Sequence, residues 1–192
     1  MIRKVTVAAM SQAIIALGVV LMIHASLGAD PWTAFTLGWS NATGLTNGRV
    51  TQLTMLALVC ANYLVGKQKP GIGAAFNIVL VGWFIDLLTP VVGIPGGLFV
   101  RWMAQLAGMV LMALGSAAYI HADLGRGPID GWGFTMGRLL HTKIGIARIV
   151  TDGIAVSVGA ALGGKVGVGT LAAAVLIGPL IQFFITRGEW RV

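Results

Sequence analysis

Six apolar stretches, each close to the length that a helix needs to cross a bilayer, dominate this sequence of 192 residues. A hydrocarbon core of about 30 Å requires about 20 apolar residues in a helix. The stretches cover residues 5–27, 50–66, 71–89, 99–122, 144–163 and 167–186. Hydrophobic residues make up 57% of the chain and charged residues 10%, which is more apolar than a water-soluble domain can be. The sequence therefore predicts an all-α membrane protein with about six transmembrane helices, surrounded by the lipid bilayer.

The basic residues are scattered singly near the ends of these stretches. The formal net charge is +7, but a nucleic-acid-binding protein gathers its basic side chains into one patch, so we expect no nucleic-acid partner. With a cytoplasmic N-terminus, ten of the 13 Lys and Arg residues face the cytoplasm and three face outward, namely Arg49, Arg101 and Lys165. Because Lys and Arg resist translocation, we expect a multi-pass protein of the inner (plasma) membrane with both termini in the cytoplasm.

An internal repeat relates the two halves of the chain. Ala-Leu-Gly at residues 16–18, followed by Ile-His-Ala-x-Leu-Gly-x-x-Pro at 23–31, recurs ninety-seven positions later, at 113–115 and 120–128. The halves cover about 5–90 and 99–187, with a linker at 90–98, so that residues 1–192 form a single membrane domain. Because the first span has an internal counterpart, we expect it to be retained and not removed as a signal peptide.

The number of spans in each half determines how the halves are related. Three spans is an odd number, so the second half starts from the opposite side of the membrane. The two three-helix repeats are therefore predicted to be inverted and related by a pseudo-two-fold axis in the membrane plane, as in many transporters.

A short helix is predicted after the first span of each half, within residues 29–48 and 126–142. Asp30 precedes Pro31 as an N-cap precedes a proline in the first turn, and Gly127 precedes Pro128 in the same way. These helices either lie in the membrane interface or re-enter the bilayer as broken helices.

Polar residues near these segments are the candidate substrate-binding residues: Asp30, Pro31, Trp32, Pro128, Asp130, Asp152, His24 and His121. Asp152 lies within an apolar stretch, where an ionisable side chain is costly, and one turn after Arg148, with which it can form an ion pair. The alternative for the two histidines is capping of the first and fourth spans. Asp86 is expected to pair with Arg101 across the linker.

Motifs for bond-making chemistry are absent from the sequence. It contains no His/Glu zinc motif, nucleophile elbow or paired carboxylates, and Cys60 is a lone cysteine in an apolar stretch. We therefore expect no enzyme, no cofactor and no bound metal.

The repeated Leu-Gly-x-x-Pro elements at 27–31 and 124–128 resemble those of the YczE/YyaS/YitT family of bacterial membrane proteins. The resemblance covers nearly the whole chain and implies an integral protein of the bacterial inner membrane, without indicating a substrate. Thr33 follows Trp32 in the first element, whereas the second has Asp130 but no tryptophan. A ligand of these elements would therefore contact the two halves unequally.

These features favour a permease for a small molecule or an ion. One alternative is a substrate-capture subunit of a multicomponent transporter, although the internal repeat argues against it. Another is a non-transporting membrane factor that acts through a partner membrane protein, for which Gly-rich helix faces would serve as docking surfaces. Assembly as a homo-oligomer is compatible with each of these.

Reporter fusions test the predicted orientation. Fusions at Arg3 and at Arg191 should both report a cytoplasmic location, because ten of the 13 basic residues then remain untranslocated. Periplasmic reporter activity at either end would refute this topology.

Overall fold

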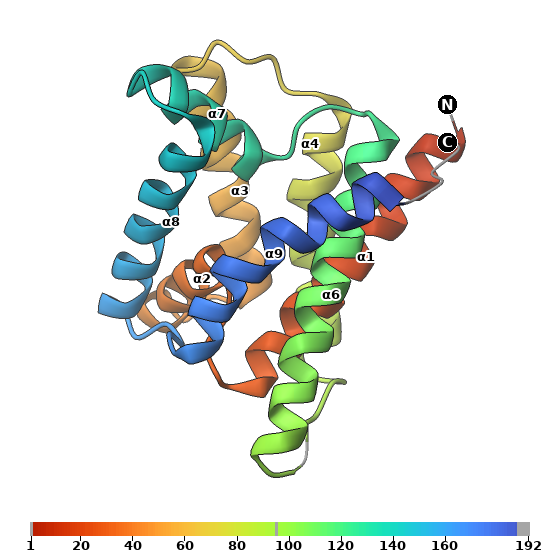
Figure 1. The fold of residues 1–192 in the computed structure, drawn as a ribbon, viewed down its shortest axis with the longest axis vertical. Helices are drawn as coiled ribbons and strands as arrows, with labels where there is room; N and C mark the ends of the chain where they lie inside the picture. The colour runs from red at the N-terminus through yellow and green to blue at the C-terminus, as the bar shows by residue number, and fades with distance from the viewer. Residues whose placement is uncertain (1, 95, 188–192) are drawn as a thin grey trace.

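The computed structural model describes residues 2–94 and 96–187, and the chain is all-helical over these residues, as predicted (Figure 1). The longer helices are α1 (Ile2–Ala25), α3 (Asn47–Leu64), α6 (Leu98–Ala122), α8 (Ile144–Ala161) and α9 (Val168–Arg187). The shorter elements are α2 (Pro31–Thr43), α4 (Ile72–Phe76), the π-helical segment η1 (Asn77–Val81), α5 (Gly82–Leu88) and α7 (Pro128–Leu139). Pro95 in the linker and Arg191 near the C-terminus, which is one of the two proposed fusion sites, lie outside the described residues.

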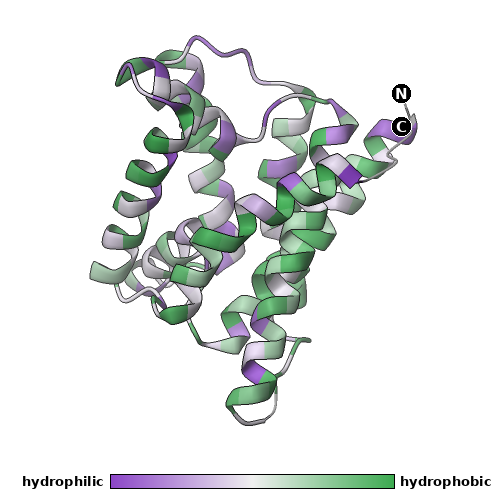
Figure 2. Ribbon diagram, in the orientation of Figure 1, coloured by the Kyte–Doolittle hydropathy of each residue, from purple (hydrophilic) through white to green (hydrophobic). Residues whose placement is uncertain are grey.

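Four of the described helices, α1, α6, α8 and α9, are long and apolar enough to cross a membrane. Figure 2 shows hydrophobic residues along much of these helices. The helix Ile72–Leu88, formed by α4, η1 and α5, is apolar but shorter. Helix α3 has sufficient length but carries polar side chains such as Gln52 and Asn62. The expected spans at 50–66 and 71–89 are thus helical but do not reach the combination of length and hydropathy that the four long helices have.

Helices α1 and α6 form the most extensive helix pair. Gly18 of α1 lies against α6 so closely that an added Cβ would be 2.6 Å from the carbonyl oxygen of Gly108. An added Cβ at Gly115 of α6 would likewise be 2.9 Å from the carbonyl oxygen of Ser11 on α1. These pairings require the two helices to be antiparallel. In a membrane, where apolar burial gives little drive, such close backbone approach allows the van der Waals contact that holds helices together.

Two equivalent backbone contacts connect the halves just beyond α1 and α6. The amide of Gly169 donates to the carbonyl of Leu27, and the amide of Gly73 donates to the carbonyl of Leu124, both at 2.8 Å. Leu27 and Leu124 are matched in the sequence repeat, as are Gly73 and Gly169. Each half therefore supplies the same contact to the other.

The predicted helix starts at Pro31 and Pro128 are confirmed. Asp30 is the N-cap of α2, and its Oδ1 accepts a hydrogen bond from the Thr33 amide at 3.3 Å. Gly127 precedes α7 and offers no side-chain cap, but Asp130 lies in the first turn. A carboxylate there interacts favourably with the positive end of the helix dipole.

Different contacts fasten the two short helices. Helix α2 packs on α8, where an added Cβ at Gly38 would be 2.5 Å from the carbonyl oxygen of Gly159. Helix α7 contacts α3 and α8, and amide side chains of Asn62 and Gln68 bind it. Both short helices are therefore fixed against the longer ones.

The expected pairing of Asp86 with Arg101 is wrong. Asp86 instead accepts hydrogen bonds from the Gly48 amide at 2.8 Å and the Thr46 hydroxyl at 2.6 Å, at the start of α3. Arg101 donates to the carbonyls of Ala25 and Ser26, at the end of α1. Unpaired backbone groups at helix ends thus bind both side chains.

Substitution of Gly18 tests the α1–α6 contact. In Gly18→Ala the new methyl group clashes with backbone, so we expect a loss of about 1–3 kcal/mol and a lower melting temperature in detergent. Gly153→Ala is the matched control because an added Cβ at this helical glycine meets nothing within 4 Å. An unchanged melting temperature for Gly18→Ala would contradict the close approach.

Candidate functional site

A cavity of about 390 Å³ lies between the N-terminal ends of α2 and α7. Residues of α1, η1, α6, α8 and α9 complete its walls. Six of the residues that the sequence singled out line it, namely Asp30, Pro31, Trp32, Pro128, Asp130 and Asp152. The structure thus brings together residues from both repeated elements and from the fifth expected span.

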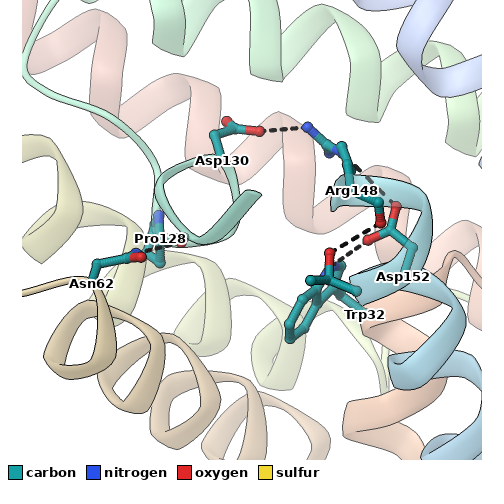
Figure 3. A network of polar contacts seen from close by, with 7 residues as sticks. Trp32, Asn62, Pro128, Asp130, Arg148 and Asp152 are labelled. Carbon is teal, nitrogen blue, oxygen red and sulfur yellow. Dashed lines mark hydrogen bonds and ion pairs between the residues drawn. The ribbon is translucent and has the colours of Figure 1, made fainter. Parts of the chain in front are cut away.

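A chain of polar contacts connects the start of α2 to the start of α7 through α8 (Figure 3). The indole Nε1 of Trp32 donates to Asp152 Oδ1 at 2.9 Å. The other carboxylate oxygen of Asp152 lies 3.8 Å from Arg148 Nε, which is the i,i+4 ion pair expected from the sequence. Arg148 Nη1 also donates to Asp130 Oδ1 at 2.7 Å. Arg148 is therefore held between two carboxylates.

Exposure to solvent differs among the side chains of this series of polar contacts. The side chains of Asp130 and Arg148 are 47% and 45% exposed, whereas that of Asp152 is 22% exposed. An ion pair that is half exposed contributes little stability. Its consequence is geometric, because Arg148 and Trp32 fix the Asp152 carboxylate from two sides.

Asp30 and Tyr119 also line the cavity and are nearly completely buried, at 4% exposure each. Oδ2 of Asp30 and the hydroxyl oxygen of Tyr119 have no hydrogen-bond partner. A buried polar atom without a partner costs about 1–3 kcal/mol. Two buried oxygen atoms of cavity-lining residues are thus left without a partner within the protein.

Asn62 of α3 positions the start of α7. Its amide Nδ2 donates to the carbonyl of Pro128 at 2.9 Å, and its Oδ1 accepts from the Thr135 hydroxyl at 2.9 Å. Gln68 donates to Thr135 Oγ1 at 2.8 Å and to the Gly131 carbonyl at 3.2 Å. Sequence reasoning missed Asn62, Gln68 and Tyr119, although an asparagine within the apolar stretch at 50–66 was a usable signal.

The two candidate histidines do not line the cavity. His121 Nδ1 lies 2.9 Å from the carbonyl oxygen of Ala117, within the last turns of α6. His24 Nε2 is buried near the end of α1 without a hydrogen-bond partner. The structure therefore does not bring either histidine together with the other candidate residues.

The cavity combines ionisable, polar and apolar side chains. It offers three carboxyl groups, one guanidinium and one phenol, together with the polar side chains of Asn77, Ser116 and Gln182 and several apolar side chains. Within residues 2–94 and 96–187, no three His, Cys, Asp or Glu side chains are grouped as metal ligands. The side chains present can hold a polar or charged molecule by hydrogen bonds and charge.

Burial raises the pKa of the Asp30 carboxyl above its ordinary value of 3.8, although hydrogen bonds from Thr33 and Trp32 oppose the shift. Asp30 lies in the connection between α1 and α2, outside the four long apolar helices. The folded state therefore favours the protonated carboxyl. The stability that this provides is complete below the unfolded-state pKa and is lost as pH rises through the folded-state pKa.

The stability of Asp30→Asn should therefore depend on pH differently from that of the unaltered protein. Asparagine caps a helix as well as aspartate and does not ionise. We expect the melting temperature of Asp30→Asn to rise relative to the unaltered protein as pH increases from the unfolded-state pKa of about 4 through the raised folded-state pKa. Asp123→Asn removes an exposed carboxyl and should show no such gain. A constant difference for Asp30→Asn over this range would contradict the raised pKa.

Comparison with known proteins places this sequence in a family. The model of the family described as "Family of unknown function (DUF6198)" matches residues 2–186. An uncharacterized protein of Haemophilus influenzae is 30% identical over 186 residues, covering 95% of this chain and 84% of the relative. The uncharacterized membrane protein YczE of Bacillus subtilis is 32% identical over 182 residues, covering 91% and 81%. The uncharacterized protein YyaS of the same species is 28% identical over 175 residues, covering 90% and 87%.

No solved structure matches the chain. The resemblance to YczE and YyaS that the repeated Leu-Gly-x-x-Pro elements indicated is confirmed. Similarity to a membrane protein over most of the chain agrees with the four long apolar helices and indicates a multi-pass membrane protein. The chain belongs to the DUF6198 family.

Proposed function

We propose that this protein is a permease for a small molecule or an ion, built from two inverted repeats of three spans each. The observation that carries the proposal is the cavity between the starts of α2 and α7, which collects Asp30, Asp130 and Asp152. Intramembrane carboxylates that face a cavity are costly and commonly mark a substrate pathway.

The paired contacts between the halves support the inverted arrangement. Gly18 meets Gly108 and Gly115 meets Ser11, and a shift of ninety-seven positions converts one pair into the other. The contacts of Leu27 with Gly169 and of Leu124 with Gly73 are related similarly, by ninety-seven positions for the leucines and, after a one-residue deletion, ninety-six for the glycines. A two-fold axis between the halves generates such reciprocal pairs. Transporters with inverted repeats bind substrate near this axis, between helix starts.

The six-span count follows from this arrangement. In the proposal, α3 and the helix Ile72–Leu88 cross the membrane as the counterparts of α8 and α9. The polar side chains of α3 are used inside the protein, since Asn62 binds α7. Both termini lie in the cytoplasm, on the side favoured by the basic residues.

Uptake by reconstituted protein tests the proposal. Proteoliposomes are incubated with a metabolite extract of isotopically labelled bacteria, and retained solutes are identified by mass spectrometry. A permease accumulates at least one solute above protein-free liposomes. Co-purification with a companion ATPase would instead favour a capture subunit. A protein that neither transports alone nor brings an ATPase would fit a membrane factor acting through partners.

Single substitutions then locate the pathway. Asp30→Asn, Asp130→Asn and Asp152→Asn each remove one carboxylate from the cavity, and at least one should lower the initial uptake rate about ten-fold, as expected for loss of a charged hydrogen bond of about 1.5–3 kcal/mol. Asp123→Asn, which lies outside the cavity, should retain the rate. Full activity in all three cavity variants would remove this cavity from the transport pathway.

A further inference from the structure

The cavity contains more acidic than basic groups. Asp30, Asp130 and Asp152 line it together with a single cation, Arg148. The guanidinium of Arg148 is already engaged by Asp130 at 2.7 Å and by Asp152 at 3.8 Å. An anion would meet three carboxyl groups and find no free cation. The charge distribution therefore favours a positively charged ligand.

The unpartnered oxygen atoms specify hydrogen-bond donors on that ligand. Asp30 Oδ2 and the Tyr119 hydroxyl are the side-chain oxygens of this cavity that are buried without a partner among the described residues. A carboxyl oxygen accepts an N–H bond in either protonation state, and a cation beside it favours the carboxylate. An ammonium ion has up to three N–H donors for such acceptors.

Most of the remaining wall is apolar. Isoleucine and methionine side chains from five helices line it, including Ile15, Met112, Ile149 and Ile177. An apolar substituent on the ligand would cover these side chains, whereas a hydrated inorganic cation would leave them facing water. A volume of about 390 Å³ falls in the range of small-molecule pockets.

We propose that this cavity binds a small organic ammonium ion, with an N–H group on Asp30 Oδ2 and its apolar part against the isoleucine wall. The proposal rests on the proposed function in that it names the substrate class of the same cavity. Trp32 and Arg148 serve as positioning residues, since they fix the Asp152 carboxylate beside the ligand.

Ligand binding to the detergent-purified full chain tests the ligand class without requiring transport. Methylammonium, butylammonium and benzylammonium are titrated by calorimetry and by thermal shift, beside 1-butanol, butyrate and Mg²⁺. At least one ammonium probe should bind ten-fold more tightly than 1-butanol and butyrate, and butylammonium more tightly than methylammonium. Failure of all three ammonium probes, equal binding of butyrate, or selective binding of Mg²⁺ would overturn the proposal.

A variant connects the binding to Asp30. Asp30→Asn preserves the N-cap and should raise the Kd of butylammonium at least ten-fold by removing a charge-assisted hydrogen bond. Asp123→Asn is the control because Asp123 is exposed, lies outside the cavity and has a φ of 51° that asparagine also tolerates. A Kd within two-fold of the unaltered protein for Asp30→Asn would refute the assigned contact.

The outcomes separate this inference from the proposed permease. Ammonium binding with the expected dependence on Asp30, but no uptake of any solute by proteoliposomes, refutes the permease and leaves the ammonium site. Uptake of a solute that butylammonium does not inhibit, together with no ammonium binding, supports the permease and refutes the ammonium site.

Discussion

A chain that leaves a helix within an apolar surrounding must find new partners for its carbonyl groups, and this constraint governs the connection after α1. The carbonyls of residues 25–28 all receive donors from the second half: two from Arg101, then the Gly169 amide and the Gln105 amide group, at 2.6 to 2.9 Å. Gly28 adopts a φ of 110°, and an added Cβ there would be 2.5 Å from the Gly167 amide. The second half therefore fixes the chain where it turns toward Asp30 and so determines where α2 begins.

The two halves hold their short helices by different contacts, and the acidic residues that they bring to the cavity differ in exposure. Helix α2 is held by close backbone contact between Gly38 and Gly159. Its N-cap, Asp30, is buried, with 4% exposure. Helix α7 is held by the side chain of Asn62, and its first-turn Asp130 stays about half exposed. The cavity is therefore lined by a buried carboxyl group from the first half and by a half-exposed carboxylate from the second.

Local rules of the chain were sufficient for much of this arrangement. Proline at a first helical position predicted both short helices at their observed starts, and the i,i+4 spacing predicted the contact of Arg148 with Asp152. What depends on three-dimensional neighbours was not predictable in this way. The role of Asn62 depends on where α7 packs, and Asp86 and Arg101 bind nearby backbone groups instead of each other, because a helix end offers several unpaired groups at once. Mean hydropathy counts every side chain, whether it faces lipid or the interior of the protein. The polar residues of α3, such as the buried Asn62, therefore lower its mean hydropathy.

Comparison of matched positions shows how the repeat divides scaffold from chemistry. Residues that are the same in both halves, such as the leucines and glycines at 27–28 and 124–125 and the prolines at 31 and 128, make the backbone contacts and start the short helices. The charged cavity residues occupy positions where the halves differ: Asp30 corresponds to Gly127, Asp130 to Thr33, Arg148 to Thr51 and Asp152 to Met55. A scaffold that needs reciprocal contacts restrains the first set of positions in both halves together. The second set is free of that restraint, so each half carries charged residues at positions where the other has none, and the acidic character of the cavity arises from these positions.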